Sequence, residues 1–426
     1  MREMKDSGIE WIGEIPKEWS TSRIKYCARL DQEKLSETTD PDYSFQYIDI
    51  GSVTEYGGIG NTIEINFAKS PSRARMVIHD GDTIISTVRT YLKAIAYIDH
   101  LKDHICSTGF CVISPGEKLH PKFGYYLLQS DYVVQKIVSE SVGVSYPAIS
   151  SVKISSIKIA LPKLDEQIRL TEYLDTRCAE IDALIAAKEK TNALLRERRQ
   201  SIIYEAVTKG LDPNAPMKDS GVEWIGEMPN GWELRKIKTS FSIVAGATPK
   251  SDVADYWDGA IPWITPADYT TEDVFVLAGR KSITQEGLDS CATTIIPSGS
   301  IIFSKRAPVG LVAINRNSLC TNQGCLSCVP RDEVDVKYHY YAMSIFCEQF
   351  DQLASGTTFK EISTEAFANF KLPHPDYHTQ QRIAANLDKK CAEIDALIDA
   401  NISTIHKLKE YRQSLIYESV TGKIEV

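Results

Sequence analysis

The stretch Cys178-Ala179-Glu180-Ile181-Asp182-Ala183-Leu184-Ile185 decides the fold, because the chain contains it twice. The same residues return as Cys391-Ala392-Glu393-Ile394-Asp395-Ala396-Leu397-Ile398, 213 positions later. Further along, Arg199-Gln200-Ser201 returns as Arg412-Gln413-Ser414 at the same displacement. The chain has 426 residues, which is twice 213, so it is a tandem duplication of one unit.

Apolar side chains between Gln167 and Lys209 have the spacing of a helix that pairs with another helix. They recur every seven residues, with Lys188 in the series, and neighbouring positions widen the stripe. The first copy of the stripe consists of Leu174, Ile181, Leu195 and Ile202, widened by Cys178, Leu184, Ile185 and Leu194. The second copy consists of Leu387, Ile394, Leu408 and Leu415, with Asn401 in the place of Lys188. This spacing predicts a coiled-coil seam.

The ends of both helices are marked by helix-terminating residues. Neither Pro nor Gly interrupts the segment 167–209; Gly210 and Pro213 end the first helix and Gly422 ends the second. A helix of about 42 residues is ~63 Å long, and one apolar stripe on such a helix needs a partner. We expect the two copies to pair antiparallel, because a whole globular domain connects them. Lys188 and Asn401 would then meet and fix the register, or both would reach solvent at the edge of the seam.

Composition is that of an ordinary globular protein, with 43% hydrophobic and 25% charged residues. No apolar run has the length of a membrane span, and no signal peptide is recognisable at the start, so we expect a cytoplasmic protein. Ten scattered cysteines fit a reducing compartment. The net charge of −9 argues weakly against nucleic acid as the sole partner, although local basic loops remain compatible with it.

The opening segment is duplicated as well: residues 4–16 return as residues 217–229. Turn-forming residues dominate it, so we predict an irregular segment. We expect Trp11, Trp224 and the neighbouring isoleucines to anchor it by packing; ligand binding by the tryptophans is the alternative.

Between these repeats the sequence predicts two mixed α/β domains. Short β-branched runs indicate strands at 47–50, 83–87, 94–98 and 110–113, followed by a helix at 123–139. The second domain has the same signals at 261–264, 300–304, 310–314 and 325–329, with a helix at 337–353. The predicted fold class is α+β, with two mixed α/β domains separated by two long helices packed as an antiparallel coiled coil. The predicted boundaries are 1–19, 20–160, 161–212, 213–232, 233–371 and 372–426.

The sequences of the two mixed domains differ much more than the sequences of the two long helices do. Asp82–Arg89 can be laid on Gly299–Arg306, but the loops differ almost everywhere. A duplication that keeps its helices and changes its loops indicates one scaffold that recognises two different ligands.

Signatures of catalysis or metal binding are missing from the sequence. There is no phosphate-binding glycine loop, and Asp40-Pro41-Asp42-Tyr43 is interpreted as a turn. Cys320, Cys325 and Cys328 contain one Cys-x-x-Cys pair, but a structural zinc site usually needs a second pair. Buried strand cysteines on opposite faces are the better interpretation. We therefore predict no catalytic residues and no metal ligands: the chain is a binder.

The chain resembles the DNA-specificity subunit of type I restriction-modification enzymes. The likeness lies in residues 6–16, in Leu161-Pro162 and Leu372-Pro373 before the helices, in Gly246–Pro249 of the second domain, and in the duplicated helices. It covers essentially the whole chain. It implies two target-recognition domains that each read one half of a split, asymmetric DNA site, and a helix pair that sets their spacing.

The resemblance also implies the partners. They are double-stranded DNA, two methyltransferase subunits docked on the helices, and motor-nuclease subunits in the restricting complex. No cofactor is expected on this chain, and S-adenosylmethionine, ATP and Mg²⁺ would be bound by the partner subunits.

Loop residues of the types that contact bases and phosphates are the candidate DNA contacts. In the first domain they are Arg73, Arg75, Arg89, Tyr91, Lys93, Ser145 and Tyr146. In the second they are Thr248, Lys250, Ser251, Lys305, Arg306, Thr357, Thr358 and Lys360. Arg89 and Arg306 coincide in the overlay, which predicts phosphate contacts for both.

Two other functions stay open at this point. The chain could be a non-catalytic scaffold that works through its helix pair, with domains that bind protein or peptide. It could also be an enzyme whose site the sequence does not reveal.

Overall fold

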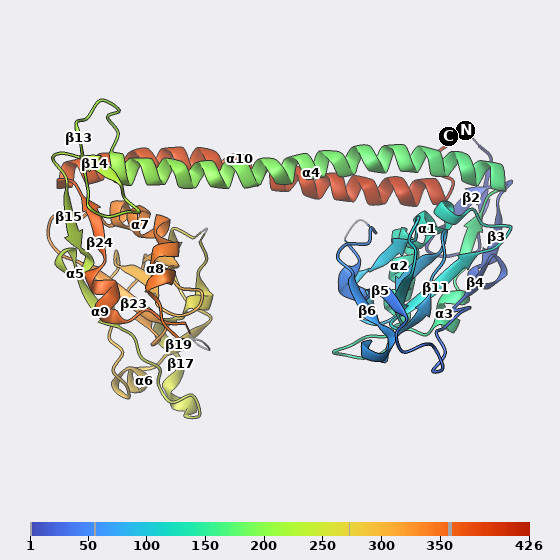
Figure 1. Ribbon diagram of the computed structural model, residues 1–426, viewed down its shortest axis with the longest axis horizontal. Helices are drawn as coiled ribbons and strands as arrows, with labels where there is room; N and C mark the ends of the chain where they lie inside the picture. Colours follow the sequence, from blue (N-terminus) through green and yellow to red (C-terminus); the bar gives the residue numbers. More distant parts are fainter. Residues whose placement is uncertain (1, 55–56, 272, 357–359) are drawn as a thin grey trace. The chain divides into compact units, whose positions relative to one another are not determined.

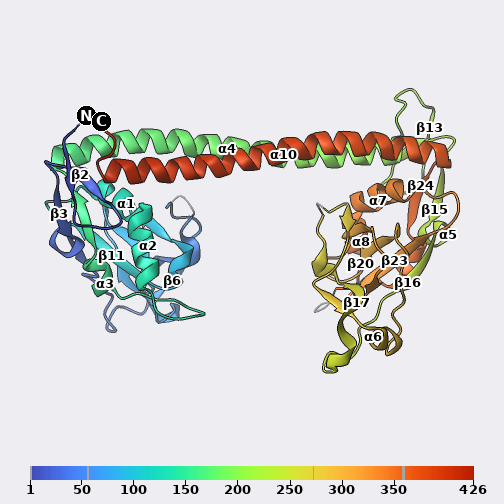
Figure 2. The same ribbon diagram turned by 180° about the vertical axis from the view of Figure 1, so that it is seen from behind.

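A computed structural model describes residues 2–54, 57–271, 273–356 and 360–426. The chain forms two compact units: unit 1 comprises Met1–Lys190 and Asn401–Val426, and unit 2 comprises Thr191–Ala400. Helices α4 (Leu164–Lys209) and α10 (Tyr377–Val420) each contribute one part to each unit. Within each unit the two helices lie side by side (Figure 1), and the view from behind agrees (Figure 2).

Both long helices confirm the sequence prediction, and the first begins three residues before Gln167. The first ends at Lys209, directly before Gly210, whose φ of 78° is left-handed. The second is followed at one residue's distance by Gly422, with a φ of 73°. Glycine adopts this conformation without the steric cost that other residues carry, and it commonly terminates helices.

The buried seam of the helix pair follows alternating steps of four and three residues. Leu174, Cys178, Ile181 and Ile185 are buried, and their repeats in α10 are buried too. The prediction was wrong for two of the flanking leucines, because Leu184 and Leu194 are 54% and 55% exposed. Each precedes a seam position by one residue, about 100° around the helix, which turns it away from the partner helix.

A polar pair marks the seam of unit 1. The Nζ of Lys188 donates to the Oδ1 of Asn401 at 3.0 Å. Of the two alternatives for these residues, the structure confirms that they meet across an antiparallel pair. A polar contact in an apolar seam favours one register over others at some cost in stability.

Two ion pairs also cross the seam, and they are copies of each other. In unit 1, Arg412 Nε lies 2.9 Å from Asp182 Oδ1. In unit 2, Arg199 Nε lies 3.1 Å from Asp395 Oδ1. Both the arginines and the aspartates are related by the displacement of 213 residues, so each copy of the helix supplies one donor and one acceptor.

The mixed domain of unit 1 contains two four-stranded sheets, ordered β6-β5-β10-β7 and β4-β11-β8-β9. Only β5 and β10 pair in parallel within them. Their strands are β4 (Ala28–Leu30), β5 (Ser44–Ile48), β6 (Ile63–Asn66), β7 (Ala74–Val77), β8 (Thr83–Ser86), β9 (Ile95–Tyr97), β10 (His104–Ser107) and β11 (Phe110–Pro115). Next to the long helix, β3 (Ser20–Arg23) pairs with β12 (Lys158–Leu161).

The mixed domain of unit 2 has a five-stranded sheet, β16-β23-β20-β21-β18, and a three-stranded sheet, β19-β17-β22. Their strands are β16 (Phe241–Ala245), β17 (Trp257–Ile264), β18 (Phe275–Val276), β19 (Lys281–Ile283), β20 (Ile301–Ser304), β21 (Val312–Asn315), β22 (Cys320–Thr321) and β23 (Cys325–Pro330). Next to the helix, β15 (Glu233–Lys236) pairs with β24 (Lys371–His374). Short helices α5 (Ile237–Ser240), α6 (Gln285–Asp289) and α9 (Thr364–Asn369) complete the domain.

Strand and helix boundaries differ from the prediction at several places, and two predicted helices are broken. The strand expected at 47–50 ends at Ile48, because the Asp49 side chain accepts from the N–H of Ser52 and caps a 3-10 turn. The helix expected at 123–139 is broken at Ser130 into α1 (Pro121–Gln129) and α2 (Asp131–Glu140). The helix expected at 337–353 is likewise α7 (Val336–Ile345) and α8 (Cys347–Leu353), with Phe346 between them.

The opening segments are ordered hairpins, which corrects the prediction of irregular structure. In unit 1, β1 (Met4–Asp6) pairs with β2 (Glu14–Pro16), and β13 (Met217–Asp219) pairs with β14 (Glu227–Pro229) in unit 2. Ile12 anchors the first hairpin as predicted, but Trp11 is 49% exposed and does not.

Each mixed domain is fixed to the long helices by a shared core and a repeated polar clamp. In unit 1, the Tyr126 hydroxyl donates to Asp175 Oδ1 at 2.8 Å, and Lys122 Nζ lies 2.9 Å from the same carboxylate. In unit 2, Tyr341 donates to Asp388 Oδ1 at 2.9 Å. The loops of each domain are therefore held on a rigid base.

Candidate nucleic-acid interface

Backbone hydrogen bonds fix which residues of the two mixed domains are equivalent. The N–H of Ile149 donates to the carbonyl of Thr87 at 2.9 Å, and the N–H of Ile362 donates to the carbonyl of Lys305 at 3.0 Å. Both contacts join the segment after the central strand, β8 or β20, to the segment before a short helix, α3 (Ser151–Ser155) or α9. Thr87 and Lys305 are therefore equivalent, at a displacement of 218.

This register corrects the sequence overlay by one residue. In the first domain Val88 forms an isolated antiparallel β-bridge with Ala148, and in the second domain Arg306 forms the corresponding bridge with Glu361. Arg306 is consequently the counterpart of Val88, and Arg89 is the counterpart of Ala307. The argument that Arg89 and Arg306 share a role because they coincide was wrong, and each residue has to be judged in its own surroundings.

Both domains close a short loop beside this segment with the same backbone bonds. We call residues 142–148 the first hairpin, and we call the described residues 355–356 and 360–361, which end the corresponding loop, the second hairpin. In each, the first and last residues exchange two backbone hydrogen bonds of 2.9–3.0 Å. Gly143 and Gly356 occupy the same place, with φ of 121° and 112°. The backbone clasp is thus common to both domains, while the side chains on it differ.

Several predicted contacts of the first domain gather around the first hairpin. The guanidinium of Arg89 lies 5.0 Å from the ring centroid of Tyr146, and the Arg89 N–H donates to the carbonyl of Pro147 at 2.8 Å. Arg89 and Lys93 flank a 3-10 turn and have φ of 51° and 50°. Non-glycine residues pay for this left-handed conformation, and such strain concentrates at functional sites.

Exposure supports a contact surface at the same place. Tyr91 and Tyr146 are 55% and 66% exposed, and Ser145 is exposed beside them. The Lys93 side chain is 54% exposed, and its Nζ lies 4.0 Å from Oδ1 of Asp131. The structure therefore brings together five predicted residues of the first domain: Arg89, Tyr91, Lys93, Ser145 and Tyr146.

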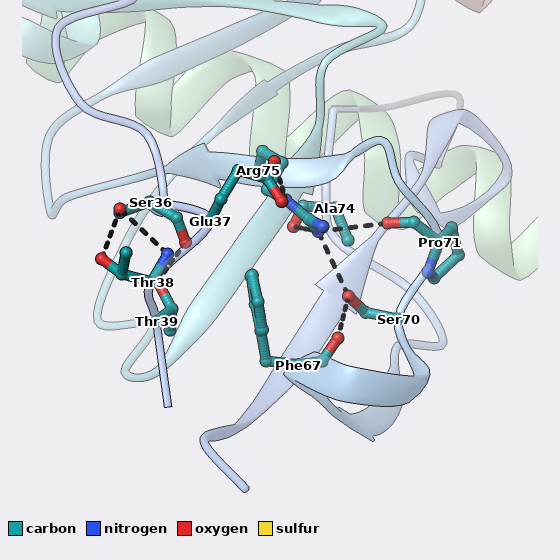
Figure 3. A network of polar contacts seen from close by, with 9 residues as sticks. All are labelled: Ser36, Glu37, Thr38, Thr39, Phe67, Ser70, Pro71, Ala74 and Arg75. Atoms are coloured by element: carbon teal, nitrogen blue, oxygen red, sulfur yellow. Dashed lines mark hydrogen bonds and ion pairs between the residues drawn. The ribbon is translucent and has the colours of Figure 1, made fainter. Parts of the chain in front are cut away.

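Arg75 lies elsewhere and already has partners. Its guanidinium donates to the carbonyl of Ala74 at 2.9 Å, lies 3.8 Å from the carboxylate of Glu37 and sits over the ring of Phe67 at 4.4 Å (Figure 3). Its side chain is only 16% exposed. These contacts stabilise a turn and leave little of the guanidinium for DNA. Arg73, two residues earlier, is exposed.

In the second domain, Glu361 holds two of the predicted cations. Lys305 Nζ and Arg306 Nε each lie 2.7 Å from its carboxylate. Burial raises the pKa of Glu361, but the bonds to the two cations outweigh it and lower that pKa overall. Lys360 pairs with Asp351. Three of the four predicted cations of this domain are thus held beside the second hairpin by carboxylates.

The remaining predicted residues of the second domain follow β16. Thr248 donates to the side chain of Gln323, Lys250 is exposed, and its carbonyl accepts from Trp257 Nε1 at 3.1 Å. Ser251 is exposed next to it. The structure places this group on another loop from the second hairpin. Thr357 and Thr358 lie outside the described residues.

Sequence reasoning missed the residues that give each hairpin its character. Glu361 was passed over because the search was for cations and hydrogen-bonding neutral residues. Val142 and Val144 were passed over because valines are ordinarily core residues, yet they are 72% and 102% exposed. A signal was available: both lie beside Gly143 in a polar stretch without a strand on either side.

The three cysteines around the Cys-x-x-Cys pair are core residues. Cys320, Cys325 and Cys328 are buried in three different hydrophobic clusters, which confirms that the pair faces opposite sides of its strand. Burial raises the pKa of Cys325 to about 12, so its thiol stays protonated at neutral pH. These residues do not converge on one point as zinc ligands would.

Comparison with known proteins decides the family. A model of the family described as type I restriction modification DNA specificity domain matches residues 16–194 and 229–406, most of the chain. The chain belongs to this family. Membership confirms the resemblance seen in the sequence, including the duplicated architecture and the prediction of a DNA-specificity subunit in place of a catalytic one.

Individual relatives agree with the family. The chain is 36% identical over 166 residues to the type I restriction enzyme MjaIX specificity subunit of Methanocaldococcus jannaschii, a match that spans 38% of each chain. It is 23% identical to the putative MjaX specificity subunit of the same organism, over 97% of this chain and 96% of that one.

Solved structures share the fold of this specificity-domain protein. A chain from a structural study of complex assembly and conformational transition in a type I R-M system matches with a TM-score of 0.76 and 26% identity, covering 96% of this chain and 99% of that one. The HsdS subunit of Thermoanaerobacter tengcongensis matches with a TM-score of 0.51 and 26% identity, over 96% and 98% of the two chains. Among the described residues, no helix is both long and apolar enough to cross a bilayer.

Proposed function

We propose that this chain is the DNA-reading subunit of a cytoplasmic type I restriction-modification complex, in which each mixed domain reads one half of a split, asymmetric site. One observation supports this above the others. In the two domains the same pair of backbone hydrogen bonds closes a short loop, at Val142 and Ala148 or at Ser355 and Glu361, but the residues of the two loops differ in sequence. A repeated frame with unlike reading surfaces fits a site whose halves differ in sequence.

The partners follow from the same proposal. Two methyltransferase subunits dock on the helix pair, one for each repeat, and motor-nuclease subunits join in the restricting complex. S-adenosylmethionine, ATP and Mg²⁺ are bound by these partners. The net charge of −9 is then reasonable for a subunit that supplies local cations while its partners complete the DNA channel.

The predicted cations differ in whether a carboxylate already binds them. Arg89 and Lys93 are cations at the edge of an exposed loop and suit phosphate contacts, which position the protein on the duplex. Lys305 and Arg306 share the Glu361 carboxylate, so a phosphate has to compete with it for them. Arg75 is proposed as a turn-stabilising residue.

A binding selection tests the proposal. The chain is purified with its methyltransferase subunits and mixed with a library of random DNA duplexes, at a stated salt concentration because phosphate contacts make affinity salt-dependent. A split motif enriched by the complex is the expected result. Exchange of residues 20–160 for the corresponding domain of another family member should change one half of that motif. Binding without sequence preference would instead support a protein-interaction scaffold.

A further inference from the structure

The first hairpin carries an exposed apolar patch, which we call the valine patch. It consists of Tyr91, Leu92, Val142, Val144 and Tyr146, which are 55%, 49%, 72%, 102% and 66% exposed. Scattered exposed apolar residues are normal, but a group of large ones on adjoining loops marks a binding surface. Val144 is as exposed as a side chain can be and sits at the tip.

The valine patch is built on a fixed frame. Its two parts are joined by the Arg89 N–H bond to the Pro147 carbonyl and by a 2.9 Å hydrogen bond between the hydroxyls of Thr90 and Ser141. The hairpin base is closed by two backbone bonds between its first and last residues. A surface held this way keeps Val144 at a defined place without help from a partner.

Cations border the patch, and this favours DNA over a protein as its occupant. Arg89 covers one face of Tyr146, and Lys93 lies at the other end of the 3-10 turn that carries Tyr91 and Leu92. An apolar tip bordered by cations fits a duplex edge, where phosphates flank base edges. The major groove is wide enough to admit a two-stranded ribbon, and the one apolar group displayed there by the four common bases is the C5 methyl of thymine.

We propose that Val144 reads a thymine in the half-site of the first domain, by packing against its C5 methyl group; this rests on the proposed function. Valine suits the task because its branched side chain is stiff and offers methyl groups at little entropic cost. The second hairpin has Ser355 in place of Val142 and Glu361 in place of Ala148, so its described ends offer no equivalent apolar surface. The counterpart of Val144 is Thr357, which lies outside the described residues, so the proposal concerns the first half-site.

Uracil substitution tests this step, because uracil is thymine without the methyl group. Once selection has given the motif and domain exchange has assigned its halves, each thymine of the first half-site is replaced by uracil in turn. One replacement should weaken binding of the complex about fourfold, the effect of removing one buried methyl group.

The variant Val144→Ala gives the decisive comparison. It should lower affinity for thymine-containing DNA and, at the responsive position, should narrow the preference for thymine over uracil, because alanine keeps only one methyl group. The matched control is Val152→Ala, which truncates a valine that is 74% exposed on α3 and should leave the thymine preference intact. Truncation of so exposed a side chain should leave the thermal unfolding midpoint unchanged, so a folding defect is readily recognised.

Three results would overturn the assignment. A first half-site in which no uracil replacement matters would do so, and so would a Val144→Ala complex whose preference for thymine is undiminished. Loss of methyltransferase subunits from this variant with unchanged DNA preference would make the valine patch a protein contact. In all three cases a split motif can still be enriched, so the proposed function stands; absence of any motif would refute the proposed function itself.

Discussion

Two buried histidines make unit 2 sensitive to acid. Burial lowers the pKa of His339 to about 3, although the hydrogen bond from its ring to the Asp335 carbonyl works in the opposite direction. Burial, aided by the nearby Arg235, lowers the pKa of His374 to about 4. In the unfolded chain both rings titrate near 6.5, so between about pH 4 and 6.5 the unfolded state binds more protons.

We therefore expect these two histidines to leave the free energy of unfolding of unit 2 unchanged above about pH 6.5 and to lower it below that pH. Each histidine contributes a slope of about 1.4 kcal/mol per pH unit in this range. Thermal unfolding of the full chain between pH 7 and pH 5 measures it. His374→Gln should reduce the slope and His406→Gln, on an exposed ring, should not. Equal slopes in all three chains would contradict the prediction.

At this scale the sequence predicted residue types better than residue roles. Five of the seven predicted contacts of the first domain lie together, because they come from two segments that the hairpin clasp joins. Arg75 could not be separated from them, since its role depends on contacts with Glu37, which is distant in the chain, and with the ring of Phe67, which no local pattern predicts. Likewise the equivalence of Arg306 with Val88 needed backbone pairing, because loops of different length shift an overlay without changing its appearance.

Among the elements, the long helices were predictable and the sheets were not. A seven-residue period, uninterrupted by Pro or Gly, determines a helix and its buried side locally. Strand partners do not follow from such a pattern: β5 pairs in parallel with β10, more than fifty residues later. Contacts at that separation depend on the whole chain, so the sequence indicated strands without their order.

The repeated ion pairs of the helix seam offer a matched comparison. Arg412 is 7% exposed and Arg199 is 16% exposed, while their partners Asp182 and Asp395 are 28% and 49% exposed. Removal of one member of a more buried pair leaves the other charge unpaired and less accessible to water, which costs more free energy. Arg412→Ala should therefore destabilise the chain by about 3 kcal/mol, and Arg199→Ala by less. Urea unfolding of both variants tests the order, and the reverse order would contradict it.

At the scale of the whole molecule, the helices join the two reading units through continuous helical segments. One extra heptad adds about 10.5 Å to a helix, the length of about three base pairs. Insertion of a heptad into α4 after Lys190 and into α10 after Ala400 preserves the seam pattern on both sides. If the helices set the distance between the half-sites, the spacer in the selected motif should lengthen by about three base pairs while both halves keep their sequence.

A single insertion is the control for this experiment. A heptad in α4 alone leaves α10 without a matching turn, so the pairs Lys188–Asn401 and Arg199–Asp395 can no longer both form in register. That variant should unfold at a lower temperature, and the double insertion should not. A stable double-insertion chain that selects the original spacer would show that the methyltransferase subunits, and not the helices, determine the distance.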